Sequence, residues 1–262
     1  MRYILRHEEA GDELGRAAGL TGFFGDGGPD GGRGSGWREF RLSGLVPTPE
    51  LTRLLGRRRP ELPNVEVAVA DDAWRVVGAY YVGGPSVVEQ LPGSAGETVD
   101  LLLNGLFFEL PPPAAQGVWR EWCRELPTRP GLWADRGPEE RAAWLHVVRV
   151  HDATARSAGA DKDPGLTYTL DAARVTDPVG FYCAIGEAVN GPGGYFGATL
   201  DGLADCLRGD FGARTPFRLV WRSSAEAVAA LARYTVPSDP SRTFTDEALD
   251  ILRQARVEVI LD

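Results

Sequence analysis

Two aspartates spaced four residues apart, Asp201 and Asp205, are the residues whose types and spacing best suit a binding function. On a helix this spacing places both carboxylates on one face, and Leu203 and Leu207 fall on the opposite face. Like charges at this spacing repel, at a cost of about a few tenths of a kcal/mol. Such an acidic face suits a basic partner, whose charges would neutralise the repulsion.

A glycine-rich loop, residues 191–197, precedes this acidic segment and carries two aromatic residues, Tyr195 and Phe196. Aromatic side chains beside a charged face are typical anchors at protein interfaces. The pattern alone also allows another interpretation, in which the acidic face is only solvated and the aromatics belong to the core.

Catalytic and metal-binding patterns are sparse. Residues 165–262 contain no histidine, so neither a Ser–His nor a Cys–His pair can form within them. Cys183 and Cys206 have helical core spacing, which predicts buried thiols. A pair between Cys123 and His146 stays open, although nothing in the spacing supports it. His146 and His151 are five residues apart and share no helix face, so no metal site and no cofactor are predicted.

The glycine-rich stretch at residues 25–36 resembles a phosphate-binding loop only in composition. Pro29 and Asp30 interrupt it, and no Lys-Ser or Lys-Thr pair follows. A flexible surface loop is the predicted structure.

Charge and hydropathy limit the class of protein. The chain has 262 residues with 28 basic and 37 acidic side chains, a net charge of −9, which argues against a general nucleic-acid binder. Residues 177–212 hold five acidic side chains and one basic side chain, so the imbalance is concentrated around Asp201 and Asp205. The first residues lack the apolar run of a signal peptide or membrane helix, and three cysteines form no disulfide framework. We therefore expect a cytoplasmic protein without membrane contact.

Two domains are expected. Residues 157–165 are small and polar and end in Pro-Gly, which is linker composition. Residues 1–160 read as strands followed by helices, which predicts an α+β domain, and residues 165–262 read as β-α-α-β-α-α-β, which predicts a small parallel sheet with helices. Within the second domain, Pro178 begins a helix, and Thr245 is the predicted N-cap of the helix over residues 246–255.

The second domain, from about residue 166 to residue 261, resembles the barstar family of intracellular ribonuclease inhibitors. The similar segments are Tyr195-Phe-Gly-Ala-Thr-Leu-Asp-Gly-Leu-Ala-Asp-Cys-Leu207, Phe217-Arg-Leu-Val-Trp-Arg222, Leu252-Arg-Gln-Ala255 and Val257-Glu-Val-Ile-Leu261. The resemblance implies a three-stranded parallel sheet with helices. It also implies that an acidic helix and the loop before it plug the active site of a secreted, guanyl-specific, barnase-like ribonuclease.

The resemblance assigns roles to individual residues. Asp205 would mimic an RNA phosphate with support from Asp201, and Tyr195 would cover the catalytic histidine of the ribonuclease. Gly209 and Asp210 would offer backbone contacts just after the helix. Gly197, in the loop before the helix, belongs to the same surface.

Four positions on or near this surface depart from the family pattern. Phe196 replaces a tyrosine, Thr199 an asparagine, Ala204 a tryptophan and Gln254 a glutamate. These changes imply either a different target ribonuclease or weaker binding. Residues 1–160 have no counterpart in the family, and joining such a domain to a barstar-like one resembles an arrangement found in bacteria.

Three functions follow as alternatives. The leading one is a ribonuclease inhibitor that is not itself an enzyme and makes no direct contact with nucleic acid. The second is a docking module for another basic protein. In the third, an enzyme in residues 1–156 uses His146 or Cys123, and the barstar-like domain regulates it.

Overall fold

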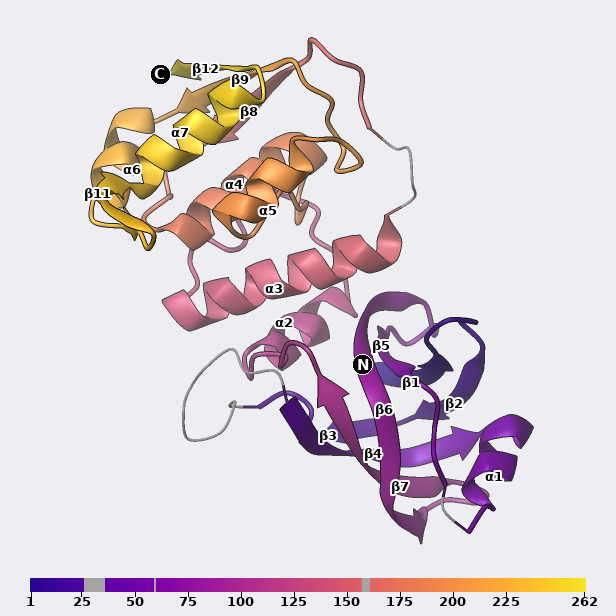
Figure 1. The fold of residues 1–262 in the computed structure, drawn as a ribbon. Coiled ribbons are helices and arrows are strands. Elements are labelled where there is room, and N and C mark those ends of the chain that lie inside the picture. Colours follow the sequence, from indigo (N-terminus) through magenta and orange to yellow (C-terminus); the bar gives the residue numbers. More distant parts are fainter. Residues whose placement is uncertain (26–35, 59, 157–160) are drawn as a thin grey trace. The chain divides into compact units, whose positions relative to one another are not determined.

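The computed structural model describes residues 1–25, 36–58, 60–156 and 161–262 (Figure 1). Its contacts divide the chain into two compact units, Met1–Glu125 and Leu126–Asp262. Most of the glycine-rich stretch at 25–36, and residues 157–160 of the expected linker, lie outside the described residues. The division at residue 125 differs from the expected boundary near residue 160, because a long helix between these positions groups with the second unit.

In its described residues, the first unit is an antiparallel sheet with two short helices. Its elements are β1 (Arg2–His7), β2 (Glu13–Ala17), β3 (Gly19–Thr21), β4 (Gly36–Pro47), α1 (Pro49–Leu55), β5 (Val65–Ala70), β6 (Val76–Pro92), β7 (Val99–Phe107) and α2 (Ala115–Trp122). The strand order is β2-β1-β5-β6-β7-β4-β3, and an additional pairing of β2 with β4 joins the two ends. The prediction that this part is mostly strands followed by helices is confirmed.

An aromatic cluster forms the core of the first unit. Phe23 packs edge-to-face against Phe40 and Phe107, with ring centroids 5.3 and 5.1 Å away. The indole Nε1 of Trp119, on α2, donates a 2.7 Å hydrogen bond to the Tyr80 hydroxyl within this core. Gly78 leaves room for the indole, since a Cβ there would lie 2.3 Å from Trp119.

The second unit is built on a three-stranded parallel sheet. Its elements are α3 (Pro138–Ala155), β8 (Thr167–Asp171), α4 (Pro178–Asn190), α5 (Leu200–Cys206), β9 (Phe217–Arg222), α6 (Ser224–Leu231), β10 (Thr235–Val236), β11 (Asp239–Thr243), α7 (Phe244–Gln254) and β12 (Val257–Leu261). The sheet order is β12-β9-β8 with both pairings parallel, which confirms the predicted sheet. Figure 1 shows α4, α5 and α7 on one side of this sheet. The hairpin of β10 and β11 was not predicted.

Helix α3 is held to α4 by buried polar contacts. Arg141 on α3 forms a 3.1 Å ion pair with Asp177, and the two side chains are 9% and 15% exposed. Asp177 also caps α4, because its Oδ1 accepts a 2.7 Å hydrogen bond from the Gly180 N–H. Before α3, Trp133 Nε1 and the Gly131 N–H both donate to the Glu187 carboxylate on α4, at 3.0 and 2.8 Å.

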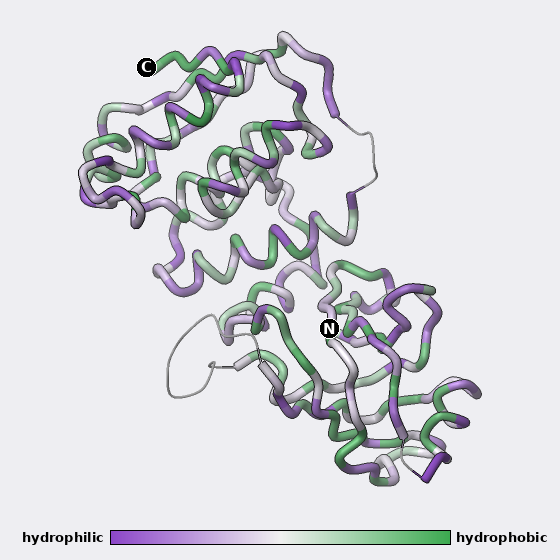
Figure 2. The backbone as a smooth tube through the Cα atoms, viewed as in Figure 1, coloured by the Kyte–Doolittle hydropathy of each residue, from purple (hydrophilic) through white to green (hydrophobic). Residues whose placement is uncertain are grey.

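Helix α7 is amphipathic and begins earlier than predicted. Figure 2 shows hydrophilic and hydrophobic residues alternating along it, and Phe244, Ala248 and Leu252 are buried. Its N-cap is Thr243, which forms a reciprocal capping box with Asp246. The prediction that Thr245 is the cap was wrong. Thr245 lies in the first turn, where its side chain is buried.

Candidate partner-binding site

Helix α5 carries the two aspartates on its exposed side. Thr199 is its N-cap, since the hydroxyl oxygen accepts a 3.0 Å hydrogen bond from the Gly202 N–H. Leu203 is fully buried, whereas Asp201 and Asp205 are both exposed. The helix therefore presents the paired carboxylates to solvent, as the spacing predicts.

The loop before α5 is folded closely onto α4 and α5. The Asn190 side chain, at the end of α4, donates to the Tyr195 carbonyl at 2.7 Å and to the Phe211 carbonyl at 3.0 Å. One amide thus ties together the loop before α5 and the loop after it. Gly197 has a φ of +99°, and a Cβ there would lie 2.9 Å from the Leu203 backbone, so this position requires glycine.

The two aromatic residues of this loop are mostly inside the unit. Tyr195 is only 8% exposed, and burial raises the pKa of its hydroxyl to about 12. Phe196 is fully buried and packs against Phe217. Both aromatic residues were predicted to contact a partner. The Phe196 side chain lies in the core, whereas Tyr195, beside α5, keeps a small exposed part.

The loop after α5 is held by two residues that the sequence analysis did not identify. The Asp161 carboxylate accepts 2.7 Å hydrogen bonds from the N–H groups of Asp210 and Gly212, and its side chain is 2% exposed. Arg156 donates a 2.6 Å hydrogen bond to the Asp210 carbonyl, and its guanidinium lies 4.2 Å from the centroid of the Phe211 ring. Arg156 directly precedes the segment 157–165 that was interpreted as a linker, and Asp161 lies within it, where composition gave no sign of a structural role.

These contacts accompany an unusual backbone conformation at Asp210. Its φ is +66°, in the left-handed region that non-glycine residues adopt only when their surroundings fix them. Its side chain is exposed, and Gly209 beside it is partly exposed. The structure thus brings Gly209 and Asp210 to the surface directly after the acidic helix.

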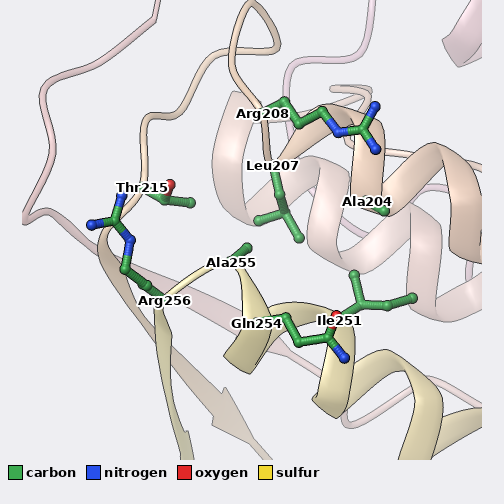
Figure 3. A pocket seen from close by; sticks show the side chains of 8 residues that line it. All are labelled: Ala204, Leu207, Arg208, Thr215, Ile251, Gln254, Ala255 and Arg256. Carbon is green, nitrogen blue, oxygen red and sulfur yellow. The ribbon is translucent and has the colours of Figure 1, made fainter.

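Ala204 and Gln254, two of the positions that depart from the family pattern, line one cavity. The cavity has a volume of about 320 Å³ and lies between α5 and α7 (Figure 3). Its other lining residues are Leu207, Arg208, Thr215, Ile251, Ala255 and Arg256. Arg208 also forms a 3.0 Å ion pair with Asp205, so the cavity adjoins the acidic face.

The three cysteines are free thiols, of which Cys183 and Cys206 are buried and Cys123 is partly buried. Burial raises the pKa of the Cys123 thiol to about 11 and that of Cys206 to about 12, so both are protonated at neutral pH. Cys123 belongs to the first unit and His146, on α3, to the second. Within the described ranges, no three His, Cys, Asp or Glu side chains are grouped so as to hold a metal ion. No helix in the described part of the chain is long and apolar enough to cross a membrane.

The second unit is therefore a small α/β domain in which the carboxylates of Asp201 and Asp205 are exposed on helix α5 rather than placed in a cleft. Residues 166–257 match the family model of barstar, described as a barnase inhibitor, so the C-terminal part of the chain carries a barstar domain. Residues before 166 have no family assignment. Neither the curated proteins nor the solved structures gave a match to this chain.

Proposed function

We propose that the second unit is an inhibitor of a guanyl-specific, barnase-like ribonuclease, and that α5 and its two flanking loops enter the ribonuclease active site. The observation that carries this proposal is the pair of exposed carboxylates, Asp201 and Asp205, on a capped helix inside the segment that matches barstar. A ribonuclease active site is basic because it binds phosphates. Carboxylates on a rigid helix can take the phosphate positions and form charge-assisted hydrogen bonds there.

The flanking residues have supporting roles in this proposal. Asp205 is the main phosphate mimic and Asp201 supports it. Gly209 and Asp210 contribute backbone groups, and the exposed edge of Tyr195 contacts the catalytic histidine of the ribonuclease. The hydrogen bond from the Asn190 side chain to the Tyr195 carbonyl supports this role, because it holds Tyr195 beside α5. A cytoplasmic location, where the inhibitor would protect cellular RNA, completes the proposal.

An inhibition assay with matched charge removals tests the proposal. We expect stoichiometric protein to inhibit a purified guanyl-specific ribonuclease at low salt. Asp205→Asn should raise the inhibition constant by about 100-fold or more, because the facing basic groups stay buried without a partner. Glu226→Gln, which removes one exposed charge on α6, is the control and should change it less than threefold.

Two outcomes would contradict different parts of the proposal. If the wild-type protein inhibits no ribonuclease of this class, the inhibitor function is wrong. If it inhibits, and Asp205→Asn inhibits equally well, the function stands and the assignment of the site to α5 is wrong.

A further inference from the structure

The cavity between α5 and α7 has an apolar floor and a polar, positively charged rim. Ala204, Leu207, Ile251 and Ala255 form the floor, and Leu207 is only 3% exposed. The rim carries the exposed guanidinium groups of Arg208 and Arg256 and the exposed amide of Gln254 (Figure 3). Among the described residues that line the cavity there is no carboxylate, although the helix beside it is acidic.

The two arginines have hydrogen-bonding capacity to spare. A guanidinium has five N–H donors, and the ion pair of Arg208 with Asp205 occupies its Nη1 while its side chain stays 79% exposed. For Arg256, the described residues provide no carboxylate within ion-pair distance. A free carboxylate is the group that such donors bind best, because its two oxygens match the planar fork of the guanidinium.

The backbone holds Arg256 at this rim. Its φ is +64°, a left-handed conformation that a non-glycine residue adopts at a cost of about 1 kcal/mol or more. This residue joins the end of α7 to the first residue of β12, Val257, which is buried and paired with Phe217. The backbone therefore fixes the position of the Arg256 Cα beside the cavity, and the guanidinium extends from there.

We propose that this cavity receives an acidic side chain, in particular a glutamate, of the protein that binds α5. Its methylenes would fill the apolar floor. Its carboxylate would pair with Arg256 and Arg208, whose guanidinium groups lie on opposite sides of the cavity in the free chain and would turn toward it (Figure 3). This inference rests on the proposed function, in which a basic ribonuclease binds α5. It adds that the surface of this ribonuclease carries a carboxylate next to its basic active site. A nucleic acid is a poorer partner for this region, because the exposed carboxylates of Asp201 and Asp205 on α5 would repel its phosphates.

Binding would then exchange ion pairs. In the free chain Arg208 pairs with Asp205 at 3.0 Å. In the complex Asp205 turns to a cation of the partner, and Arg208 turns to the partner's carboxylate, so that one internal pair becomes two pairs across the interface. A partner with only basic groups at this place would leave both arginines facing like charge, which makes the cavity a specificity determinant.

A direct binding experiment tests the cavity without any ribonuclease. The full chain, labelled with ¹⁵N, is titrated with N-acetyl-L-glutamic acid α-amide, and N-acetyl-L-glutamine amide serves as the neutral control at the same ionic strength. We expect saturable amide shifts at residues 204–208 and 254–256 with the acid only. Arg256→Gln should weaken this binding at least threefold. Equal shifts with both compounds, or no shifts at these residues, would overturn the proposal.

A second experiment uses a ribonuclease that the wild-type protein inhibits. Arg256→Glu and Arg222→Glu each change the net charge by −2, and Arg222 is an exposed residue at the end of β9. If only overall charge mattered, both variants would bind a basic ribonuclease faster and at least as tightly as the wild type. We expect Arg256→Glu instead to weaken inhibition at least tenfold and Arg222→Glu not to weaken it. Tightening by both variants would refute the carboxylate partner while leaving the inhibitor function intact.

Discussion

Asp161 fixes the loop that follows α5 from a position outside the segment that matches barstar. Burial alone would raise the pKa of its carboxyl, but hydrogen bonds from the Asp210 and Gly212 N–H groups and the nearby Arg214 lower it overall. A lowered pKa in the folded state means that ionised Asp161 stabilises the fold. This contribution is present above the pKa of an unfolded aspartate, about 3.9, and is lost as the pH falls through the lower folded value.

We expect Asp161→Asn to lower the free energy of unfolding by about 2 kcal/mol at pH 7, because hydrogen bonds to a charged buried acceptor are lost. The difference from the wild type should shrink as the pH falls below about 3.9, because the carboxyl of the unfolded chain then binds a proton while the folded carboxyl, with its lowered pKa, is still ionised. Urea unfolding at pH 7 and at pH 3 measures both quantities. Asp163→Asn, at an exposed neighbouring position, is the control, and equal stability of the two variants at pH 7 would contradict this role.

At the scale of elements, α3 behaves as part of the second unit. Trp133 before it is 2% exposed, and its indole donates to Glu187 on α4. Arg141 pairs with Asp177 at the start of α4. A helix bound by such contacts belongs to the same compact unit as the segment that matches barstar, so we propose that the folding unit begins near residue 126.

Two truncated chains test this boundary. We expect residues 126–262 to unfold in one cooperative thermal transition. Residues 161–262 should unfold about 10 °C lower or more, because losing Trp133 and the partner of Asp177 removes about 3 kcal/mol or more. Calorimetry of both chains gives the comparison. Equal midpoints would show that α3 is dispensable and that the boundary lies near residue 160.

Sequence patterns could predict some elements of this fold and not others. The strands β8, β9 and β12 are short segments with regularly placed apolar residues, and helices separate each strand from the next, which is enough to predict a parallel sheet. In the pairing of β2 with β4, Gly15 lies opposite Pro47 and Arg16 lies opposite Val46. A contact between such distant segments produces no pattern in the local sequence. The periodicity of α3 indicates a helix, but periodicity does not say which unit its apolar face covers.

The candidate site was predictable to a similar degree. The i, i+4 spacing placed Asp201 and Asp205 on one exposed face, and the resemblance pointed to the loops around them. Arg156 and Asp161 were missed because their role depends on contacts with residues about 50 positions later in the chain. The burial of Phe196 follows from packing against Phe217, and spacing alone does not distinguish a core aromatic from an exposed anchor.

At the scale of the whole molecule, the net charge of −9 gives a prediction about association. Attraction between an acidic surface and a basic ribonuclease speeds their encounter, and salt screens it. We expect the association rate constant to fall about tenfold or more between 50 and 500 mM NaCl, as the Debye length falls from about 14 to about 4 Å. Stopped-flow fluorescence with the inhibited ribonuclease measures this rate.

One charge variant on α5 and one on α6 sharpen this measurement. Asp205→Asn should show a shallower salt dependence than the wild type, because its charge lies where the ribonuclease approaches. Glu226→Gln changes the net charge equally and should keep a slope closer to that of the wild type. A rate independent of salt in the wild-type protein would show that charge does not guide the encounter.

The single amide of Asn190 that joins both loops around α5 has a thermodynamic consequence. Because Asn190, Asp161 and Arg156 already order these loops in the free chain, the binding surface loses little conformational entropy when a partner arrives. The heat capacity change of association should therefore correspond to the surface buried between two preorganised proteins, without the larger contribution that accompanies folding on binding.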